Sequence, residues 1–245
     1  MNIKLTFLLL FLTFIGFSQN QENSGSVVYK INASKKKSDQ GVKDSNIDFY
    51  NRTISRLDEL KYHLEFNKEK SLFKIENALV NDTDKSDFFL KSAKLFGGEE
   101  IYYTNLKDKK VTIQRTMLGE IFLIEDAIQT DWKLTSETKL IANYKCLKAE
   151  MILEKNKIYV NDIKIIAWFT PEIPLPFGPR GYNGLPGLIL ELNYGDINYY
   201  ATEIKFENQV QISKPTQGIK ITSEEFETYI SQKIDEYGFE NKSKN

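Results

Sequence analysis

The sequence predicts a mainly β fold: a curved antiparallel sheet or open half-barrel with a few covering helices, one of them at the C-terminus. Short segments rich in β-branched and aromatic residues follow one another between polar or glycine-containing turns, and apolar residues alternate within several of them. Helical periodicity is restricted to a few short segments. With 245 residues, 41% of them hydrophobic, the chain can build one large core.

The N-terminal half is expected to hold a strand, a cover and a hairpin. Residues 26–32 form the expected first strand, and a polar loop follows. A helical spacing then indicates a short helix or an irregular cover, through Tyr50, Ile54 and Leu57. The alternation in KYHLEFNKEKSLFKIE, residues 61–76, predicts a hairpin around its polar turn. Residues 84–98 carry a helical pattern that Gly97 can end.

The middle of the chain predicts a meander. Three short strands are expected, at residues 99–105, 109–116 and 119–126. Residues 130–169 continue the pattern. Two strand faces of one parity are formed there by Leu147, Ala149, Met151 and Leu153, and by Ile163, Ile165, Ala167 and Phe169. Residues 188–192 and 197–206 flank the turn NYGD and predict a second hairpin.

The C-terminus predicts a helix. Thr222 and Glu225 can form a capping box at its start, and Gly238 can end it. Its apolar face comprises Phe226, Tyr229, Ile230, Ile234 and Tyr237. Because such a face needs a partner, we expect the helix to cover the sheet.

The N-terminus, MNIKLTFLLLFLTFIGFSQN, has the form of a secretory signal peptide. Lys4 precedes an apolar run over residues 5–17, and small residues stand at Gly16 and Ser18. The rival interpretation, a membrane anchor, needs about 20 apolar residues, whereas polar residues begin here at Ser18. Residues 1–18 are therefore expected to be a signal peptide.

Residues 19–245 are expected to form one β-rich domain that is exported to the periplasm or secreted, without an integral membrane segment. The single cysteine, Cys146, lies far from the expected cleavage site, so the protein is not expected to be a lipoprotein. One cysteine cannot form an internal disulfide, so the core itself must stabilise the fold.

Charge is balanced along the chain. The sequence has 33 basic and 34 acidic residues, a net charge of −1. No long-range field of one sign is expected, which argues against nucleic acid and anionic membrane surfaces as partners. The strongest basic cluster, residues 35–37, lies in a polar stretch and is interpreted as a solvated loop.

Residue types that carry catalysis or bind metals are scarce. The chain has one histidine and one cysteine, so no metal site of converging ligands is predicted. His63 has the parity opposite to the apolar face of its strand, which favours a surface or sheet-edge position. Glu99 and Glu100 are neighbours on a strand and point to opposite faces, so they form no acid/base pair. No catalytic residue and no cofactor is predicted.

Residues 169–192, FTPEIPLPFGPRGYNGLPGLILEL, hold five of the six prolines and four of the 13 glycines. We call this segment the Pro/Gly loop. Proline fixes φ and glycine permits positive φ, so a stiff loop is expected, with positive φ at Gly184 or Gly187.

An arginine held beside aromatic rings in such a loop can bind a carboxylate or stack on a planar group. The candidate ligand-binding residues are Trp168, Phe177, Arg180, Tyr182 and Asn183. In the structural alternative, Arg180 pairs with a neighbouring carboxylate and the aromatic residues close one end of the sheet.

The end of the Pro/Gly loop, YNGLPGLILEL, resembles the defining motif of the GLPGLI family of secreted Bacteroidetes proteins. The motif residues are Gly184, Leu185, Pro186, Gly187, Leu188 and Ile189. Two companion stretches, residues 131–150 and 167–179, precede the motif in the order that the family shows. The family has no established activity, cofactor or partner. The resemblance implies export in a Gram-negative cell and a β-rich fold, and we see an analogy of fold with the open half-barrels of periplasmic lipid and lipoprotein carriers.

Two classes of function remain open. The first is a non-enzymatic binding or carrier-like module for a small hydrophobic, lipid-like or peptide-like ligand, favoured by the export signal, the aromatic strands and the stiff loop. The second is a hydrolase-like enzyme whose catalytic carboxylates are dispersed along the sequence. An apolar cavity without convergent titratable groups would favour the first, whereas two facing carboxylates with shifted pKa values would favour the second.

Overall fold

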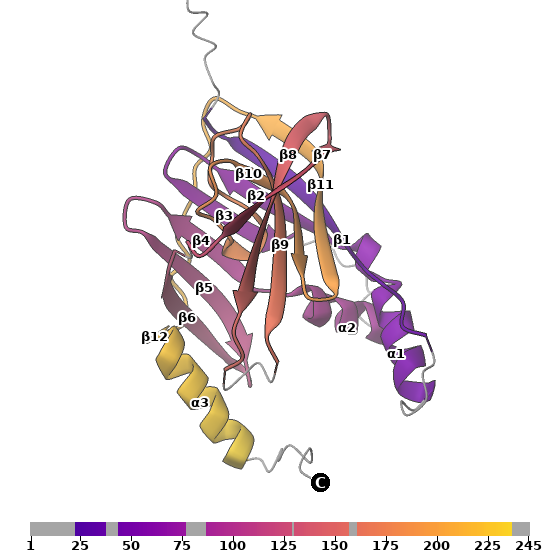
Figure 1. Cartoon of the computed structure of the whole chain (residues 1–245). Helices are drawn as coiled ribbons and strands as arrows, with labels where there is room; N and C mark the ends of the chain where they lie inside the picture. The colour runs from indigo at the N-terminus through magenta and orange to yellow at the C-terminus, as the bar shows by residue number, and fades with distance from the viewer. Residues whose placement is uncertain (1–22, 38–43, 77–86, 129, 157–160, 237–245) are drawn as a thin grey trace, which may run out of the picture.

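The computed structural model describes residues 23–37, 44–76, 87–128, 130–156 and 161–236. They form one open sheet with helices beside it (Figure 1). The strands are β1 (Gly25–Ala33), β2 (Lys61–Phe66), β3 (Lys70–Ile75), β4 (Ile101–Asn105), β5 (Lys110–Met117), β6 (Glu120–Ala127), β7 (Lys133–Ile141), β8 (Tyr144–Leu153), β9 (Ile163–Thr170), β10 (Leu188–Tyr194), β11 (Ile197–Phe206) and β12 (Ile219–Thr222). The helices are α1 (Asp44–Ile54), α2 (Phe88–Gly97) and α3 (Ser223–Glu236), with short 3-10 turns η1 (Leu57–Glu59) and η3 (Pro179–Gly181). The expected signal peptide, residues 1–18, lies outside the described residues.

The described strands form one twelve-stranded sheet in the order β12-β6-β5-β4-β3-β2-β1-β11-β10-β9-β8-β7. Every neighbouring pair is antiparallel except β12 and β6, which run parallel. The edges are β12 and β7, which are not paired with each other, so the sheet is open. The predicted mainly β fold is confirmed.

The inner face of the sheet carries a continuous aromatic core. Register places Tyr29 opposite Tyr62 and Phe73 opposite Tyr102, so their side chains share one face. The rings of Tyr62 and Phe73 stack at 5.4 Å, and Tyr199 from β11 meets Tyr62 edge-on at 5.5 Å. These five residues are at most 5% exposed. We call the face that they define the inner face, and the opposite one the outer face.

Two helices pack together at one end of the sheet (Figure 1). The expected cover around residue 50 is α1 followed by η1, and the expected second helix is α2. Asp87 caps α2 by accepting a hydrogen bond from the amide of Leu90 at 3.0 Å. The helix ends at Gly97, and the following Gly98 has φ of +86°. None of the described helices has the length and apolar character needed to span a membrane.

The C-terminal helix α3 docks on the inner face beside β6, as its apolar pattern predicts. Thr222 and Glu225 form the predicted capping box, with hydrogen bonds of 2.8 Å and 3.2 Å between side chains and amides. Phe226 lies edge-on against Phe122 at 5.2 Å and is 2% exposed. Tyr237 and Gly238, expected at the end of this helix, lie outside the described residues.

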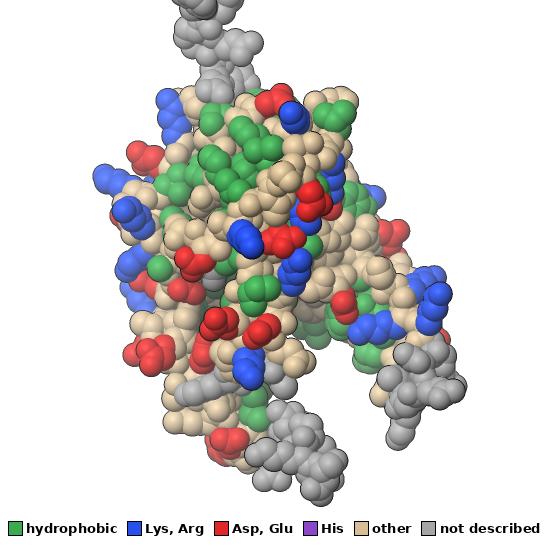
Figure 2. Space-filling model, in the orientation of Figure 1, with side chains coloured by type: hydrophobic (Ala, Val, Ile, Leu, Met, Phe, Trp, Pro, Cys, Tyr) green, Lys and Arg blue, Asp and Glu red, His purple; other side chains and the backbone are tan. Residues whose placement is uncertain are grey.

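The segment between β11 and β12 crosses the outer face, which the sequence did not indicate. Lys214 pairs with Glu125 at 2.7 Å, and Gln114 donates to the carbonyl of Gln217 at 2.8 Å. The crossing carries the chain from the centre of the sheet to its edge, where β12 pairs with β6. In Figure 2, basic and acidic side chains are interspersed over the face in view, in keeping with the balanced charge of the sequence.

Candidate functional site

The Pro/Gly loop is held by backbone contacts that explain its glycines. The amide of Leu188 donates to the carbonyl of Ile173, and that of Ile189 to the carbonyl of Phe177, each at 2.9 Å. Gly184 has φ of +84°, as predicted for one of the two motif glycines. Gly187 is needed for a different reason: a Cβ there would lie 2.1 Å from the carbonyl oxygen of Thr170. The chain can make this close approach only with glycine.

The backbone turn at Arg180 points its side chain at the inner face. Arg180 has φ of 55° and ψ of 27°, and Gly181 follows with φ of +73°. The left-handed conformation costs little at glycine, but at Arg180 it is costly unless the surroundings hold the residue. The guanidinium is held by Tyr199, whose hydroxyl accepts from Nη1 at 3.1 Å, and by the rings of Tyr194 and Tyr102, at 4.5 Å and 5.6 Å from Cζ.

A carboxylate and a second guanidinium extend this cluster. Arg115 on β5 pairs with Glu100 at 2.9 Å, and both side chains are less than a fifth exposed. Burial by itself would raise the pKa of Glu100, but the charges of Arg180 and Arg115 outweigh it and hold the pKa below its ordinary value. Burial by itself would lower the pKa of Arg180. The neighbouring Tyr102, Tyr199 and Glu100 outweigh burial and raise the pKa above its ordinary value. Glu100 and Arg180 are therefore both charged at neutral pH.

Gly98 brings the end of α2 against this cluster. A Cβ at Gly98 would lie 2.5 Å from Nη1 of Arg180 and 2.6 Å from Oε2 of Glu100. Tyr62 donates to the carbonyl of Gly98 at 3.0 Å, and Tyr199 donates to the carbonyl of Gly97. The carbonyl end of a helix is electronegative, so its approach to Arg180 is favourable.

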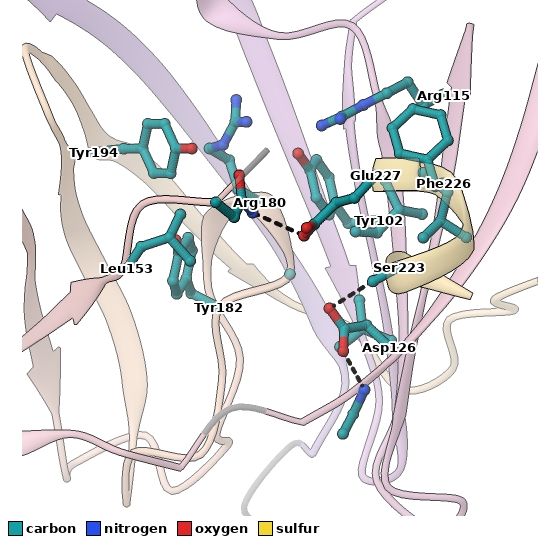
Figure 3. A pocket seen from close by; sticks show the side chains of 16 residues that line it. Tyr102, Arg115, Asp126, Leu153, Arg180, Tyr182, Tyr194, Ser223, Phe226 and Glu227 are labelled. Carbon is teal, nitrogen blue, oxygen red and sulfur yellow. Dashed lines mark hydrogen bonds between the residues drawn. The ribbon is translucent and has the colours of Figure 1, made fainter. Parts of the chain in front are cut away.

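A pocket of about 170 Å³ lies beside Arg180 on the inner face (Figure 3). The sheet curls so that strands from its two halves line this one pocket with α3. Figure 3 shows Tyr182, Tyr194 and Leu153 on one side, Arg115, Phe226 and Glu227 on the other, and Arg180 and Tyr102 between them. The other lining residues are Val111, Ile113, Ile124, Asp126, Ala127, Asn156, Gly181 and Ser223. The lining thus combines apolar and aromatic surface with charges of both signs.

The acidic residues of the pocket lie on the side of α3 and β6. Ser223 donates to Oδ2 of Asp126 at 3.0 Å, and the amide of Ala127 lies 2.7 Å from Oδ1. Asn156 donates to Oε1 of Glu227 at 2.8 Å. Asp126 thus has both oxygens engaged, whereas Glu227 has one.

The candidate ligand-binding residues predicted from the sequence divide into three groups. Arg180 and Tyr182 line the pocket. Phe177 and Asn183 are buried and form an isolated antiparallel β-bridge with each other. The carbonyl of Asn183 accepts a hydrogen bond from the indole nitrogen of Trp132 at 2.8 Å. Trp168 lies on the outer face, with Nζ of Lys139 at 4.3 Å above its ring. Of the motif residues, Leu185, Leu188, Ile189 and Gly187 are buried, whereas Gly184 and Pro186 are exposed.

The sequence did not indicate several residues of the site: the pocket residues Tyr102, Arg115, Tyr194, Phe226 and Glu227, and Glu100 beside them. One signal was present for Arg115, which shares the parity of the apolar residues Val111 and Ile113 on its strand. A charge on an apolar strand face indicates a buried partner. The partner itself could not be found, because Glu100 precedes β4 and its contact with Arg115 depends on how the strands pair.

The only histidine and cysteine of the chain lie away from the pocket. His63 is on the outer face, as its parity predicts, with Nε2 3.4 Å from a carboxylate oxygen of Glu76. Cys146 is buried, and burial raises the pKa of its thiol to about 11. Among the described residues, no three His, Cys, Asp or Glu side chains are grouped in a way that could hold a metal ion.

Comparisons with known proteins match part of the chain and the fold. A model of the family Porph_ging, described as a protein of unknown function, matches residues 153–191. No curated protein matches the sequence. Two crystal forms of PNGF-II are similar in structure, with TM-scores of 0.53 and 0.50 and 17% identity, over 85% and 86% of this chain. A LolA superfamily protein from Nitrosomonas europaea is also similar, with a TM-score of 0.29 and 6% identity over 77% of this chain and 88% of its own.

The likeness to PNGF-II concerns the fold alone, since the identity is low. This chain spans 33% of the length of the PNGF-II chain that it matches. The family model matches from Leu153 on the pocket wall to residue 191 of the Pro/Gly loop, and so includes Arg180 and Tyr182.

Proposed function

We propose that the protein is an exported, non-enzymatic binding module of the GLPGLI type, whose ligand enters the pocket between the Pro/Gly loop and α3. The one observation that carries the proposal is the placement of Arg180. Its charge sits on the inner face between Tyr194 and Tyr102, at the wall of a cavity that strands from both halves of the sheet enclose. A concave, mostly apolar pocket with a few fixed polar groups is the usual form of a ligand site.

The size of the pocket limits the ligand. Sites for drug-sized molecules have volumes of about 300–1,000 Å³, whereas this pocket has about 170 Å³. A complete lipid chain exceeds that space. Of the hydrophobic, lipid-like and peptide-like ligands considered from the sequence, a small molecule or a single residue of a peptide-like ligand fits best.

The enzymatic alternative rests on the carboxylates of the pocket. Hydrolysis by dispersed carboxylates needs one that can give or take a proton near the substrate. Glu100, which lies beside the pocket, is held ionised by two arginines, and both oxygens of the pocket residue Asp126 accept hydrogen bonds. Binding therefore has more support than catalysis.

The export signal and the single domain over residues 19–245 complete the proposal. Protein recovered from its native compartment is expected to begin at Gln19 without an attached lipid. Intact-mass analysis checks this, and an added acyl mass or retained residues from 1–18 would contradict it.

Blocking the pocket tests the proposed function. Leu153→Trp should fill the cavity, because Leu153 is half-buried on its wall (Figure 3). The matched control is Ile152→Trp, since Ile152 is the neighbour on β8, faces the other way and is 54% exposed. Small molecules released from the natively exported proteins are measured by mass spectrometry. We expect the same released species from wild type and Ile152→Trp, and their loss from Leu153→Trp. Identical profiles from the two variants would contradict a ligand site in this pocket.

A further inference from the structure

We infer that the pocket recognises a small zwitterion with an apolar body, such as an apolar amino acid, whose carboxylate is held by Arg180 and whose ammonium is held by Glu227. This inference rests on the proposed binding function and adds the chemical class of the ligand. It follows from the two charges of the pocket that the protein itself leaves incompletely bonded.

Arg180 has donors to spare. Its Nη1 donates to Tyr199, and among the described residues its Nε and Nη2 have no hydrogen-bond partner. Neither nitrogen belongs to the buried unpartnered atoms, so both remain accessible. An arginine with two adjacent open N–H groups matches the two oxygens of a carboxylate. The rings of Tyr194 and Tyr102 fix the guanidinium in place, which lowers the entropic cost of binding.

Glu227 supplies the opposite charge from α3. Asn156 donates to its Oε1, and its Oε2 has no hydrogen-bond partner among the residues that the structure describes. The residue is half-buried at the pocket, one position after the docked Phe226. A fixed carboxylate with one open oxygen is an acceptor for an ammonium group.

The remaining charged groups of the pocket are already bonded. Arg115 pairs with Glu100, and Asp126 accepts from Ser223 and from the backbone. Within the part of the chain that the structure describes, Arg180 and Glu227 have accessible polar atoms without a hydrogen-bond partner, and they lie on different elements. A ligand with a single charge would leave one of the two without a partner in a half-buried site, whereas a zwitterion satisfies both.

The pocket that these charges line has room for a short apolar body. An enclosed cavity of about 150 Å³ can admit benzene, so about 170 Å³ accommodates a ring or a branched aliphatic group. Val111, Ile113, Ile124 and Leu153 provide aliphatic walls, and Tyr182 and Phe226 provide aromatic ones. These surfaces match a side chain such as that of phenylalanine or leucine.

Binding of three related compounds tests the inference without altering the protein. Isothermal titration calorimetry would compare L-phenylalanine, L-phenylalanine amide, which lacks the carboxylate, and N-acetyl-L-phenylalanine, which lacks the ammonium. We expect L-phenylalanine to bind and each blocked compound to bind roughly tenfold more weakly or worse. The two blocked compounds also represent the first and last residues of a peptide. Tighter binding of either one than of L-phenylalanine would assign the site to a chain end and overturn the free zwitterion.

A variant on α3 assigns the ammonium site. Glu227→Gln should lower the affinity for L-phenylalanine roughly tenfold. The affinity for N-acetyl-L-phenylalanine should stay the same, because that compound has no ammonium group for Glu227 to bind. Glu224→Gln is the control, since Glu224 is exposed on the same helix and does not line the pocket. Equal affinities of wild type and Glu227→Gln for L-phenylalanine would overturn the assignment.

Failure of the inference and failure of the proposed function give different results. Suppose that neither L-phenylalanine nor L-leucine gives a heat of binding, but wild type still releases a species that Leu153→Trp lacks. That result would refute the zwitterion as ligand and leave the proposed binding function supported. Absence of a species that depends on Leu153 would refute the binding function itself.

Discussion

The hydroxyl of Tyr199 accepts a hydrogen bond from Nη1 of Arg180 at 3.1 Å and donates one to the carbonyl of Gly97. One side chain at the centre of the sheet thereby joins the Pro/Gly loop to the end of α2. Tyr199 is fully buried, and burial raises the pKa of its hydroxyl, so it stays neutral and can serve as donor and acceptor together.

Removal of Arg180 should destabilise the fold. Arg180→Ala leaves Tyr199 without its donor and Glu100 with one guanidinium fewer, so we expect a loss of about 3 kcal/mol in the free energy of unfolding. Urea denaturation measures it. Arg180→Lys is the comparison, since it keeps the charge but not the planar group over Tyr194, and it should lose less. A loss under about 0.5 kcal/mol for Arg180→Ala would show that the side chain is not part of the core.

Glu100 should make stability depend on pH. Its pKa in the folded protein lies below the ordinary value of 4.5, so its ionised form stabilises the fold at neutral pH. That contribution is present above pH 4.5 and is lost as the pH falls through the lower, folded-state pKa. Glu100→Gln should therefore cost about 2 kcal/mol at neutral pH and progressively less in acid. Unfolding free energies of both proteins at several pH values check this, and a difference independent of pH would argue against it.

Substitution of two glycines distinguishes a steric clash from backbone strain as the reason why glycine is needed. Gly187→Ala places a methyl group 2.1 Å from the carbonyl oxygen of Thr170 and should destabilise by about 3 kcal/mol. Gly119 has φ of +82° but open space around it, so Gly119→Ala should cost only the left-handed strain of about 1 kcal/mol. Thermal melts of both variants provide the comparison. The steric explanation fails if the melting temperature of Gly187→Ala equals or exceeds that of Gly119→Ala.

The docking of α3 can be measured at Phe226. Phe226→Ala removes a ring that is 2% exposed and packed on Phe122, so we expect a loss of about 3 kcal/mol. Ile234 lies two turns further along the same helix and is 37% exposed, and Ile234→Ala should cost about 1 kcal/mol or less. Equal effects in chemical denaturation would mean that the helix is not anchored through Phe226.

The thiol of Cys146 should resist alkylation in the folded protein. It is buried and its pKa is raised to about 11, so little reactive thiolate forms at neutral pH. Iodoacetamide should modify it only after unfolding in concentrated urea, as mass spectrometry would show. Rapid modification of the native protein is the contrary result.

The sequence by itself determined most of the strands, the C-terminal helix and the stiffness of the loop. Alternation is a local property, so the hairpin at residues 61–76 and the capped helix that begins at Ser223 could be located without tertiary information. The Pro/Gly content of residues 169–192 likewise predicted a shaped turn and the positive φ of Gly184. The short strand β12 was missed because its partner β6 is about 100 residues away in the sequence.

Only the tertiary structure decided which residues meet at the pocket. Arg180 and Glu227 are separated along the chain by three elements, β10, β11 and β12, and they line one cavity because the sheet curls and α3 returns to its inner face. Trp168 lies on the outer face, away from Arg180, because it alternates along β9 with the inward-facing Ala167 and Phe169. Local patterns fix the side of a strand on which a residue lies, but the partners across the sheet depend on pairing and curvature, which are set by contacts distant in sequence.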